Sequence, residues 1–285
     1  MRVLVTGCNG YIGSHTAKHL AQHGYDVHGL DILPYTHNDV SRYLSRFIHG
    51  DIQDLTHINV QYDCVVHLAA LVDVVESNRI PSWYYKTNII GTDNVIRNTQ
   101  YDNFVFSSTA AAFDPISPYG RSKVCAEDIV KQLCKSYTIF RFFNVGGSDG
   151  EFYQIREPTH MIGRAALAAL GRTDLVINGT NYDTRDGTCL RDYVDVEDIA
   201  CAIQKAVDIP ANTEYECLST GVTHSNLEVV EAMRTVSNTN FEVQFGPRRE
   251  NDIVVVEAPN TSSYFTSTKT LDQICESTYN VLKSV

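Results

Sequence analysis

A tyrosine and a lysine stand four residues apart in the stretch SPYGRSK, residues 117–123, and this pair could move a proton. If the stretch begins a helix, Tyr119 and Lys123 lie on one face, so both side chains can reach the same small molecule. A free phenol has a pKa near ~10 and is a poor base at neutral pH. A neighbouring cation favours the phenolate and lowers that pKa. The pair therefore predicts a proton-transfer site that Lys123 tunes.

Three glycines near the N-terminus predict a phosphate-binding turn. Gly7, Gly10 and Gly13 fall between an apolar run and a helical pattern, in the stretch TGCNGYIG. Glycines permit a tight turn and a close approach to a pyrophosphate, and the helix N-terminus adds amide donors. Asp31 closes the second strand-like run, 24 residues after Gly7. A carboxylate there can accept hydrogen bonds from an adenosine ribose and repels a 2′-phosphate, so the pattern predicts NAD rather than NADP.

The helix that follows the glycines carries His15, His19 and His23 at intervals of four residues. Such spacing could form a metal-binding face. No glutamate stands in the intervening turn, and the helix also needs a polar side. We therefore expect a solvated face and no metal site.

Short β-branched runs alternate with helical patterns through the first half of the chain. Near-continuous apolar strands that alternate with helices indicate a parallel sheet covered on both faces. The expected strands are 2–7, 25–31, 46–51, 63–69, 103–108 and 137–143, and the expected helices are 12–23, 80–99 and 120–135.

The alternation of strands and helices becomes less regular after about residue 144, where loops rich in Gly, Thr, Asn and Asp appear. We expect an α/β fold: a Rossmann-type doubly wound parallel sheet over residues 1–145 that binds NAD, and a smaller, irregular α/β domain over 146–285 that binds the substrate. A segment at 189–207 can return to the first domain. The expected helices of the second half are 160–170, 196–207, 225–236 and 270–283.

The composition excludes some classes of protein. A formal charge of −11 and a pI near 5.3 argue against nucleic-acid binding, which needs a basic face. No apolar run approaches the length of a membrane span, and because the first strand-like run begins at Arg2 we expect no signal peptide. The eight cysteines show no C-x-x-C pair and are expected to be reduced thiols in a cytoplasmic protein.

Several motifs, taken in order along the chain, resemble those of the extended short-chain dehydrogenase/reductases, and more narrowly those of the UDP-galactose 4-epimerases. The resemblance runs from Met1 to about Ala200. Its most specific part is NYDTRDGTCLRDYVDVEDIA, which is similar to a stretch typical of 4-epimerases. The other motifs are TGCNGYIGSHT, GLDIL, HGDIQD, HLAALVDVVES, YYKTNIIGT, FSST, SPYGRSK, FRFFNVGG and EPTHMI.

This resemblance implies an isomerase that inverts carbon 4 of a UDP-hexose, UDP-glucose and UDP-galactose or their N-acetyl forms, through a transient 4-keto sugar. NAD would remain bound through each cycle. Tyr119 would be the acid/base, Lys123 its tuning partner and ribose anchor, and Thr109 would bridge the sugar O4 to the phenol. Val256 falls where many epimerases have a residue that gates the C2 substituent, and its small size would admit an N-acetyl group.

The resemblance also assigns residues to each ligand and a partner to the chain. A homodimer would form through paired helices near 80–99 and 120–135, and Arg185 is expected to be structural. Arg191 and Arg249 would bind the diphosphate, since a guanidinium can contact two phosphate oxygens. The cofactor site would contain Gly7, Gly10, Tyr11, Ile12, Gly13, Asp31, Asp51, Ile52, Leu68, Ala69, Ala70, Asn88, Ser107 and Phe142 beside Tyr119 and Lys123. The substrate site would contain Thr109, Asn144, His160, Met161, Arg191, Arg249 and Asp252.

Related enzymes that begin with the same oxidation are the alternatives. Dehydratases usually carry an Asp-Glu pair directly after the active-site Thr, and UDP-glucuronate decarboxylases a Glu just past the hydroxyl residue. Here Thr109 precedes AAA, with no acid before Asp114, which argues against both. Asp31 disfavours an NADPH-dependent ketosugar reductase. A non-catalytic protein that binds NAD or a nucleotide sugar is a further alternative, because the segment AAAFDP before SPYGRSK is much shorter than usual in the family.

Overall fold

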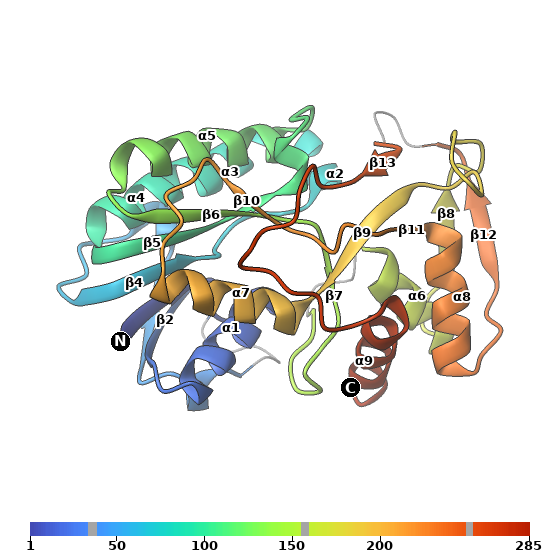
Figure 1. Cartoon of the computed structure of the whole chain (residues 1–285), viewed down its shortest axis with the longest axis horizontal. Helices are drawn as coiled ribbons and strands as arrows, with labels where there is room; N and C mark the ends of the chain where they lie inside the picture. The colour runs from blue at the N-terminus through green and yellow to red at the C-terminus, as the bar shows by residue number, and fades with distance from the viewer. Residues whose placement is uncertain (34–38, 155–159, 249–252) are drawn as a thin grey trace. The chain divides into compact units, whose positions relative to one another are not determined.

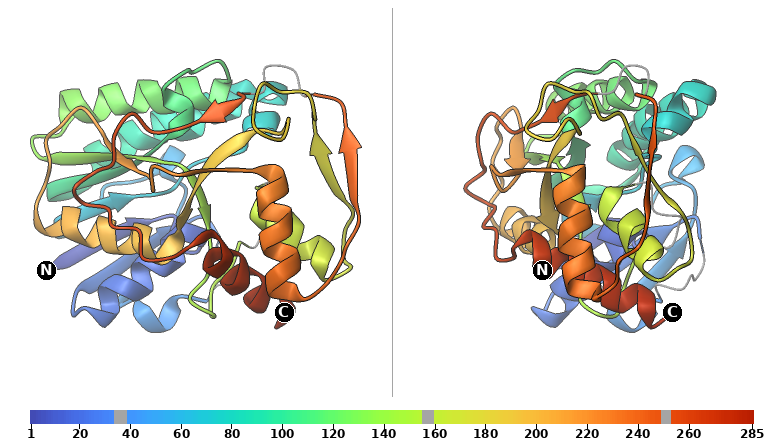
Figure 2. Two further views of the ribbon diagram at one scale, coloured as in Figure 1. Left: turned by 45° about the vertical axis from the view of Figure 1, so that its right-hand side comes forward. Right: turned by 90° about the vertical axis from the view of Figure 1, so that its right-hand side faces the viewer.

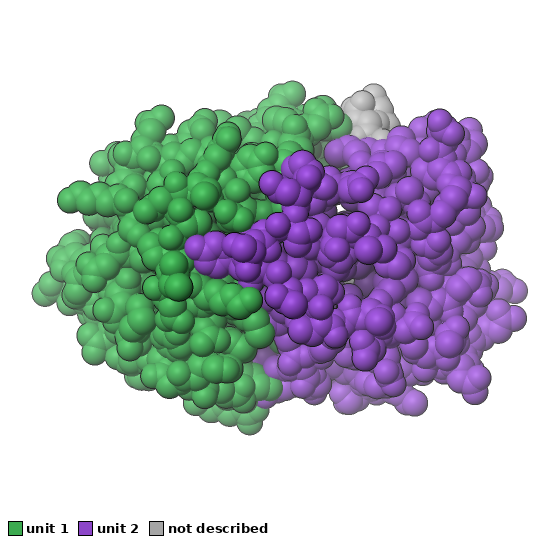
Figure 3. All heavy atoms as spheres, in the orientation of Figure 1, with its two compact units in different colours: residues 1–142, 199–217 green, residues 143–198, 218–285 purple. Residues whose placement is uncertain are grey.

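The computed structural model describes residues 1–33, 39–154, 160–248 and 253–285. These residues form two compact units, which Figure 3 colours separately. The first unit consists of Met1–Phe142 and Ile199–Cys217, and the second of Phe143–Asp198 and Leu218–Val285. The segment of the second half that joins the first unit is thus Ile199–Cys217, while residues 189–198 belong to the second unit.

A seven-stranded sheet forms the centre of the first unit, in the order β10-β6-β5-β4-β1-β2-β3. Every strand pair from β6 to β3 is parallel. The order runs outward from β1 and β4 in opposite directions, so the switch point of the sheet lies between these two strands, where ligands bind in such folds. The predicted doubly wound sheet is confirmed. The strands are β1 (Arg2–Thr6), β2 (Asp26–Asp31), β3 (Arg46–His49), β4 (Gln61–His67), β5 (Gln100–Thr109), β6 (Tyr137–Phe142) and β10 (Glu216–Leu218).

Helices cover both faces of this sheet, as Figures 1 and 2 show. One face carries α1 (Tyr11–Gln22) and α7 (Val196–Asp208), and the other carries α3 (Pro81–Tyr85), α4 (Gly91–Asn98) and α5 (Pro118–Leu133). The core beneath α4 and α5 is made of buried aliphatic and aromatic side chains, which is what a strand covered on both faces requires. Among them are Leu4, Val65, Phe104, Phe106, Val130 and Ile139.

The single helix expected over 80–99 is wrong in detail. The stretch begins earlier, with α2 (Val74–Arg79), and is interrupted at Ile80, whose φ of −131° is not helical. Pro81 explains this interruption, because a proline disfavours the helical conformation of the residue before it. A π-helical turn, η3 (Lys86–Ile90), then separates α3 from α4. Such π-turns occur frequently at functional sites.

The expected solvated histidine face of α1 is also wrong for one of its members. His15 is buried, and its Nδ1 lies 2.8 Å from the carbonyl oxygen of Tyr11. His19 is half-buried and its Nε2 lies 2.6 Å from Oε1 of Gln204 on α7, whereas His23 is exposed. The packing of α7 beside α1 accounts for this difference. Within the described part of the chain, no group of His, Cys, Asp and Glu could hold a metal ion.

The described residues of the second unit combine short strands with helices. Strands β7 (Asn144–Gly146), β11 (Thr223–Ser225) and β13 (Val255–Val256) each pair with β9 (Leu190–Asp195). A second, parallel pair consists of β8 (Leu175–Asn178) and β12 (Val243–Gly246). The expected helices are present as α6 (Met161–Ala169), α8 (Asn226–Ser237) and α9 (Leu271–Lys283). Their core includes Ile162, Ala166, Val230, Met233 and Ile274.

Arg185 makes a two-point contact with α8, in agreement with its expected structural role. Its Nε donates to Oε1 of Glu228 at 2.6 Å, and its Nη2 donates to Oε2. The Arg185 hydrogen bond lowers the pKa of Glu228 to about 2, with further help from the backbone amide of Ser225. Ser225 and Glu228 also form the capping box that begins α8.

The remaining expectations concern membranes and thiols. Among the helices of the described residues, none is both long and apolar enough to cross a membrane. All eight cysteines are free, and six are buried; Cys125 and Cys201 are exposed. Most of the thiols are therefore buried, and the reduced state stays a prediction.

Candidate active site

The glycine turn between β1 and α1 is packed so closely that side chains cannot enter it. Gly7 has a φ of +71°, and a Cβ there would lie 2.8 Å from the amide nitrogen of Ala69. A Cβ on Gly13 would lie 1.9 Å from the carbonyl oxygen of Gly7. Gly10 occupies the N-cap position of α1 and supplies no side-chain cap. The turn therefore exposes only backbone atoms at the N-terminus of α1. This arrangement fits a pyrophosphate.

Asp31 stands at the end of β2, next to this turn. Its carboxylate accepts hydrogen bonds from the amides of Asn9 at 2.9 Å and Leu33 at 3.0 Å. Burial raises the pKa of Asp31, and these amides partly oppose the rise. The backbone thus fixes a carboxylate at the carboxyl edge of the sheet, where it can accept a ribose hydroxyl.

A second group of predicted cofactor residues follows β4 and lines the same edge. The amides of Leu68 and Ala69 donate to the backbone oxygen and the hydroxyl of Thr6, both at 3.2 Å. Asn88, in the π-turn, accepts from the amide of Leu71 at 2.9 Å. The other predicted cofactor residues are Ala70, directly after Ala69; Ser107, whose hydroxyl donates to the carbonyl of His67; Phe142, which is buried at the end of β6; Asp51, which caps a short 3-10 turn; Ile52, which is buried in the core; and Tyr11 and Ile12, which are half-buried at the start of α1.

The three predicted catalytic residues come together at the end of β5 and the start of α5. Tyr119 and Lys123 lie on the buried face of the helix, 8% and 3% exposed. The Thr109 hydroxyl acts on the Tyr119 phenol and lowers its pKa, and the Lys123 ammonium lies 4.6 Å from the centre of the Phe106 ring. Ser117 caps α5 by accepting from the Gly120 amide, which places Tyr119 in the first turn.

The electrostatics of this pair differ from the expected tuning. Burial raises the pKa of Tyr119, and the hydrogen bond with Thr109 opposes that rise. Burial also lowers the pKa of Lys123 to about 7, although the charge of Glu127 acts in the other direction. The same loss of water that disfavours the phenolate disfavours the ammonium. The expected lowering of the Tyr119 pKa by Lys123 is therefore wrong for the protein alone.

Several buried polar residues near this site were missed by the sequence analysis. Glu127 follows Lys123 by four residues, as Lys123 follows Tyr119. This regular spacing in the sequence could have identified Glu127 as a member of the site. Its partner Arg141 lies on β6. His67 lies between the hydroxyls of Thr6 and Thr92, at 2.7 and 3.1 Å, and burial lowers its pKa to about 3. It is thus a neutral histidine, with no sequence signal beyond its place after an apolar run.

In the second unit, two of the predicted substrate residues lie on strands that pair with each other. Asn144 on β7 donates to the carbonyl of Asp192 on β9 at 3.2 Å. Arg191, also on β9, donates to the carbonyls of Leu190 and Val254 at 2.8 and 3.2 Å. Val256 is the register partner of Arg191.

The other predicted substrate residues are His160, Met161, Arg249 and Asp252. His160 is exposed at the N-cap of α6, and Met161 is half-buried against the core of the second unit. Arg249 and Asp252 lie outside the described residues. Their roles stay predictions.

Residues 3–217 match a protein family described as the NAD dependent epimerase/dehydratase family. A similar relative is the UDP-glucose 4-epimerase of Rhizobium meliloti (strain 1021). It is 36% identical over 291 residues, which cover 90% of this chain and 88% of the relative.

Solved structures with the same fold also carry epimerase names. The UDP-glucose 4-epimerase of Bifidobacterium longum, in complex with NAD+ and UDP, superposes with a TM-score of 0.89 at 27% identity, over 100% of this chain and 98% of that one. The corresponding enzyme of Stenotrophomonas maltophila, with bound NAD and formylated UDP-arabinopyranose, gives a TM-score of 0.88 at 28% identity, over 100% and 98%.

Proposed function

The chain belongs to the NAD dependent epimerase/dehydratase family, and on this premise we propose that it is an NAD-dependent 4-epimerase of a UDP-hexose. The observation that carries the proposal is the group formed by half-buried Thr109 and the buried Tyr119 and Lys123 at the carboxyl edge of the sheet. The glycine turn and Asp31 lie in the same unit and fit NAD. Relatives named as 4-epimerases that align over most of the chain supply the reaction class.

In this proposal each catalytic side chain has one task. Thr109, which already acts on the Tyr119 phenol, orients the sugar O4 hydroxyl toward Tyr119. The Tyr119 phenolate accepts the O4 proton and later returns it. Bound NAD would supply the reversible hydride acceptor for carbon 4 of the sugar, so that the 4-keto sugar could be reduced on its opposite face. A protonated Lys123 favours the phenolate and anchors the nicotinamide ribose.

We assign the remaining predicted residues to two ligands, one for each unit. The first unit would be the cofactor domain, with Asp31 accepting the adenosine ribose hydroxyls. The second would hold the nucleotide sugar, with Arg191 on the diphosphate and Asn144 near the nucleotide. Arg191 donates to two backbone carbonyls, and its planar guanidinium is of the type that binds phosphate oxygens in pairs.

The residues that follow Thr109 favour epimerisation over its rivals. Ala110–Ala112 form a 3-10 turn that Thr109 caps, so three methyl groups occupy the place where dehydratases and decarboxylases carry acids. The relatives are named for glucose and arabinose forms of the UDP-sugar. We propose that the small Val256 also admits an N-acetyl group at C2. A Val256→Tyr variant should then lose only N-acetylated substrates.

We further propose that the protein is a cytoplasmic homodimer. Eight free cysteines suit a reducing compartment. The helices over 80–99 and 120–135 would form the interface, because α3 and the π-turn expose the apolar side chains of Trp83 and Ile90.

Proton NMR of the purified protein tests the proposed reaction. UDP-glucose, UDP-N-acetylglucosamine, UDP-glucuronate and UDP-xylose are supplied in turn without added NAD. A product with a changed H4 coupling supports a 4-epimerase with retained cofactor and identifies its substrate. A 4-keto-6-deoxy signal would indicate a dehydratase, and loss of carbon dioxide from the uronate a decarboxylase. No turnover, repeated with NAD added, would favour a non-catalytic binding protein.

A further inference from the structure

A buried carboxylate lies one helical turn beyond the proposed acid/base pair. Tyr119, Lys123 and Glu127 follow one another at intervals of four residues on α5, so they share a face. Glu127 is 1% exposed. A carboxylate removed so completely from water is destabilising unless its oxygens are hydrogen-bonded and its charge is paired.

Both strands beneath α5 satisfy this carboxylate. Arg141 on β6 donates from Nε to Oε1 at 2.9 Å and from Nη2 to Oε2 at 2.7 Å. Ser108 on β5 donates its hydroxyl to Oε1. Ser108 and Arg141 are register partners in the sheet. Glu127 therefore fixes α5 against two neighbouring strands at a point directly before Thr109.

The arginine of this pair is itself held in place by aromatic rings. Its guanidinium carbon lies 3.9 Å from the centre of the Tyr215 ring and 4.6 Å from that of Phe113. Phe113 directly follows the turn Ala110–Ala112, which Thr109 caps. Glu127 thus contacts Ser108, directly before Thr109, and is linked through Arg141 to Phe113, which follows the turn that Thr109 caps.

Glu127 also lies one helical turn beyond Lys123, and its charge acts on that ammonium. The other titratable groups near these two residues are Tyr119 and Lys131 on the same helix, the neutral His67 on β4, and Arg141 on β6. Lys131 Nζ lies 4.0 Å from Oε2 of Glu127, and Arg141 forms the ion pair with the same carboxylate. Burial lowers the pKa of Lys123 to about 7, and the charge of Glu127 raises it. Glu127 thus favours the charged form of Lys123.

We propose that Glu127 is a positioning residue for the reaction: it fixes the helix that carries Tyr119 and Lys123 against the strand that carries Thr109, and it supplies a negative charge one helical turn from Lys123. This proposal rests on the proposed function. It assigns no contact between Glu127 and the substrate.

The electrostatic half of the proposal is tested without substrate. Lysine labelled with carbon-13 at Cε is incorporated into the full chain, and the Lys123 signal is assigned by its loss in a Lys123→Arg variant. Its titration midpoint should fall by about one pH unit in Glu127→Gln. It should not move in Asp128→Asn, which removes the same charge from the exposed neighbouring residue of α5. Equal midpoints in Glu127→Gln and the parent protein would overturn the proposal.

Kinetics test the positioning half. In Glu127→Gln we expect kcat to fall about 10- to 100-fold, with KM and NAD content unchanged. The alkaline limb of the kcat profile should move to lower pH together with the NMR midpoint. An unchanged kcat profile would contradict the proposal. If the parent protein turns over no UDP-hexose, the proposed function fails, and the titration still decides whether Glu127 controls Lys123.

A second variant covers the case in which Glu127→Gln does not fold. Arg141→Lys keeps both charges but removes the two-point hydrogen bond and the flat stacking surface. We expect its Lys123 midpoint to stay near that of the parent protein while kcat falls and KM does not. A kcat equal to that of the parent would overturn the positioning role.

Discussion

Tyr119 is the residue on which the proposed chemistry depends. Its identity and its distance from Lys123 are visible in the sequence, whereas its electrostatics are not. Burial raises the pKa of Tyr119, and that burial depends on side chains far away in the sequence. One of them is Tyr84, whose ring packs edge-on against the Tyr119 ring, with the two ring centres 6.3 Å apart. Spacing along one helix is a local property, but removal from water is a property of the whole packed unit.

Replacement of Tyr119 by phenylalanine should abolish proton transfer and preserve the fold. We expect kcat to fall about 10²- to 10⁴-fold, because a positioned acid/base contributes a factor of that size. The measurement is UDP-hexose turnover by NMR, with bound NAD quantified after denaturation. Tyr84→Phe is the matched control, since it removes the hydroxyl group of the neighbouring tyrosine. A Tyr119→Phe variant as active as this control would contradict the assigned role.

The elements of the first unit could be predicted well because their signals are local. The expected strand and helix at 2–7 and 12–23 correspond to β1 and α1 within one or two residues. The strands of the second unit were missed, since several are only two to four residues long. Their pairing with distant partners, such as β13 with β9, leaves no periodicity that a sequence pattern can show.

The glycine turn gives a prediction at this scale. Gly13→Ala places a Cβ 1.9 Å from the Gly7 carbonyl oxygen, so the turn must open, at a cost of about 1–3 kcal/mol. We expect a lower melting temperature and little bound NAD in the purified protein. Gly50→Ala is the control, because a Cβ there meets no atom within 4 Å. Equal NAD content in the two variants would argue against cofactor binding at the turn.

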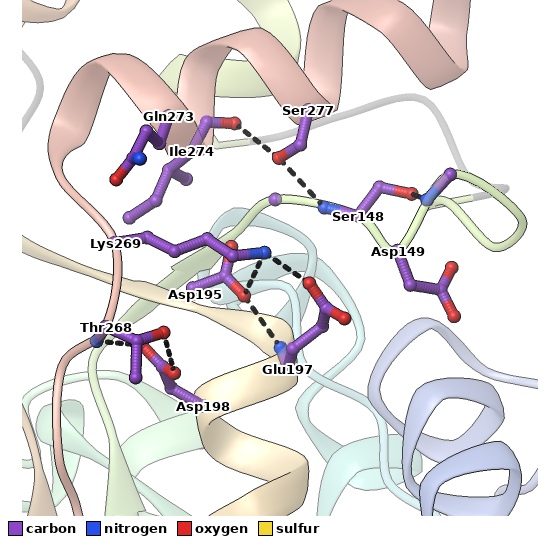
Figure 4. A network of polar contacts seen from close by, with 12 residues as sticks. Ser148, Asp149, Asp195, Glu197, Asp198, Thr268, Lys269, Gln273, Ile274 and Ser277 are labelled. Carbon is purple, nitrogen blue, oxygen red and sulfur yellow. Dashed lines mark hydrogen bonds and ion pairs between the residues drawn. The ribbon is translucent and has the colours of Figure 1, made fainter.

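A polar network joins the segment before α9 to the start of α7 in the second unit (Figure 4). The Lys269 ammonium pairs with Glu197 and lies 3.4 Å from Oδ1 of Asp195. Thr268 donates its amide and hydroxyl to Asp198 at 2.8 and 2.6 Å. Burial raises the pKa of Asp195 to about 6, and Lys269 opposes the rise.

This network predicts a pH-dependent effect of Lys269→Met. The folded-state pKa of Asp195 exceeds its unfolded value of 3.8, so its protonation favours the fold, and this contribution is lost as the pH rises through 6. Above that pH the ionised Asp195 needs Lys269. We expect a loss of about 1–3 kcal/mol in the free energy of unfolding at pH 8 and a smaller loss at pH 5.

Urea unfolding at the two pH values measures this difference. The exposed Lys135 supplies the control variant Lys135→Met, which should change stability little at either pH. A loss in Lys269→Met that is the same at pH 5 and pH 8 would show that the ionisation of Asp195 does not control the network.

At the scale of the whole molecule, the proposed dimer accounts for large apolar side chains on the surface. Trp83 is 67% exposed and Ile90 is 50% exposed. Trp83→Glu places a charge in the proposed interface, so light scattering after size exclusion should report a monomer. Val222→Glu changes an exposed apolar residue of the second unit, outside the proposed interface, and should leave the dimer intact. A parent protein that is monomeric would contradict the proposal directly.

The reaction itself is tested most directly with UDP-glucose that carries deuterium at carbon 4. The proposed mechanism removes that deuterium as a hydride to bound NAD and returns it to the same carbon from the other side. Proton NMR should therefore show UDP-galactose with deuterium retained at carbon 4 and no exchange with solvent. A product with a solvent-derived hydrogen at carbon 4, or no epimer from any UDP-hexose, would contradict the account.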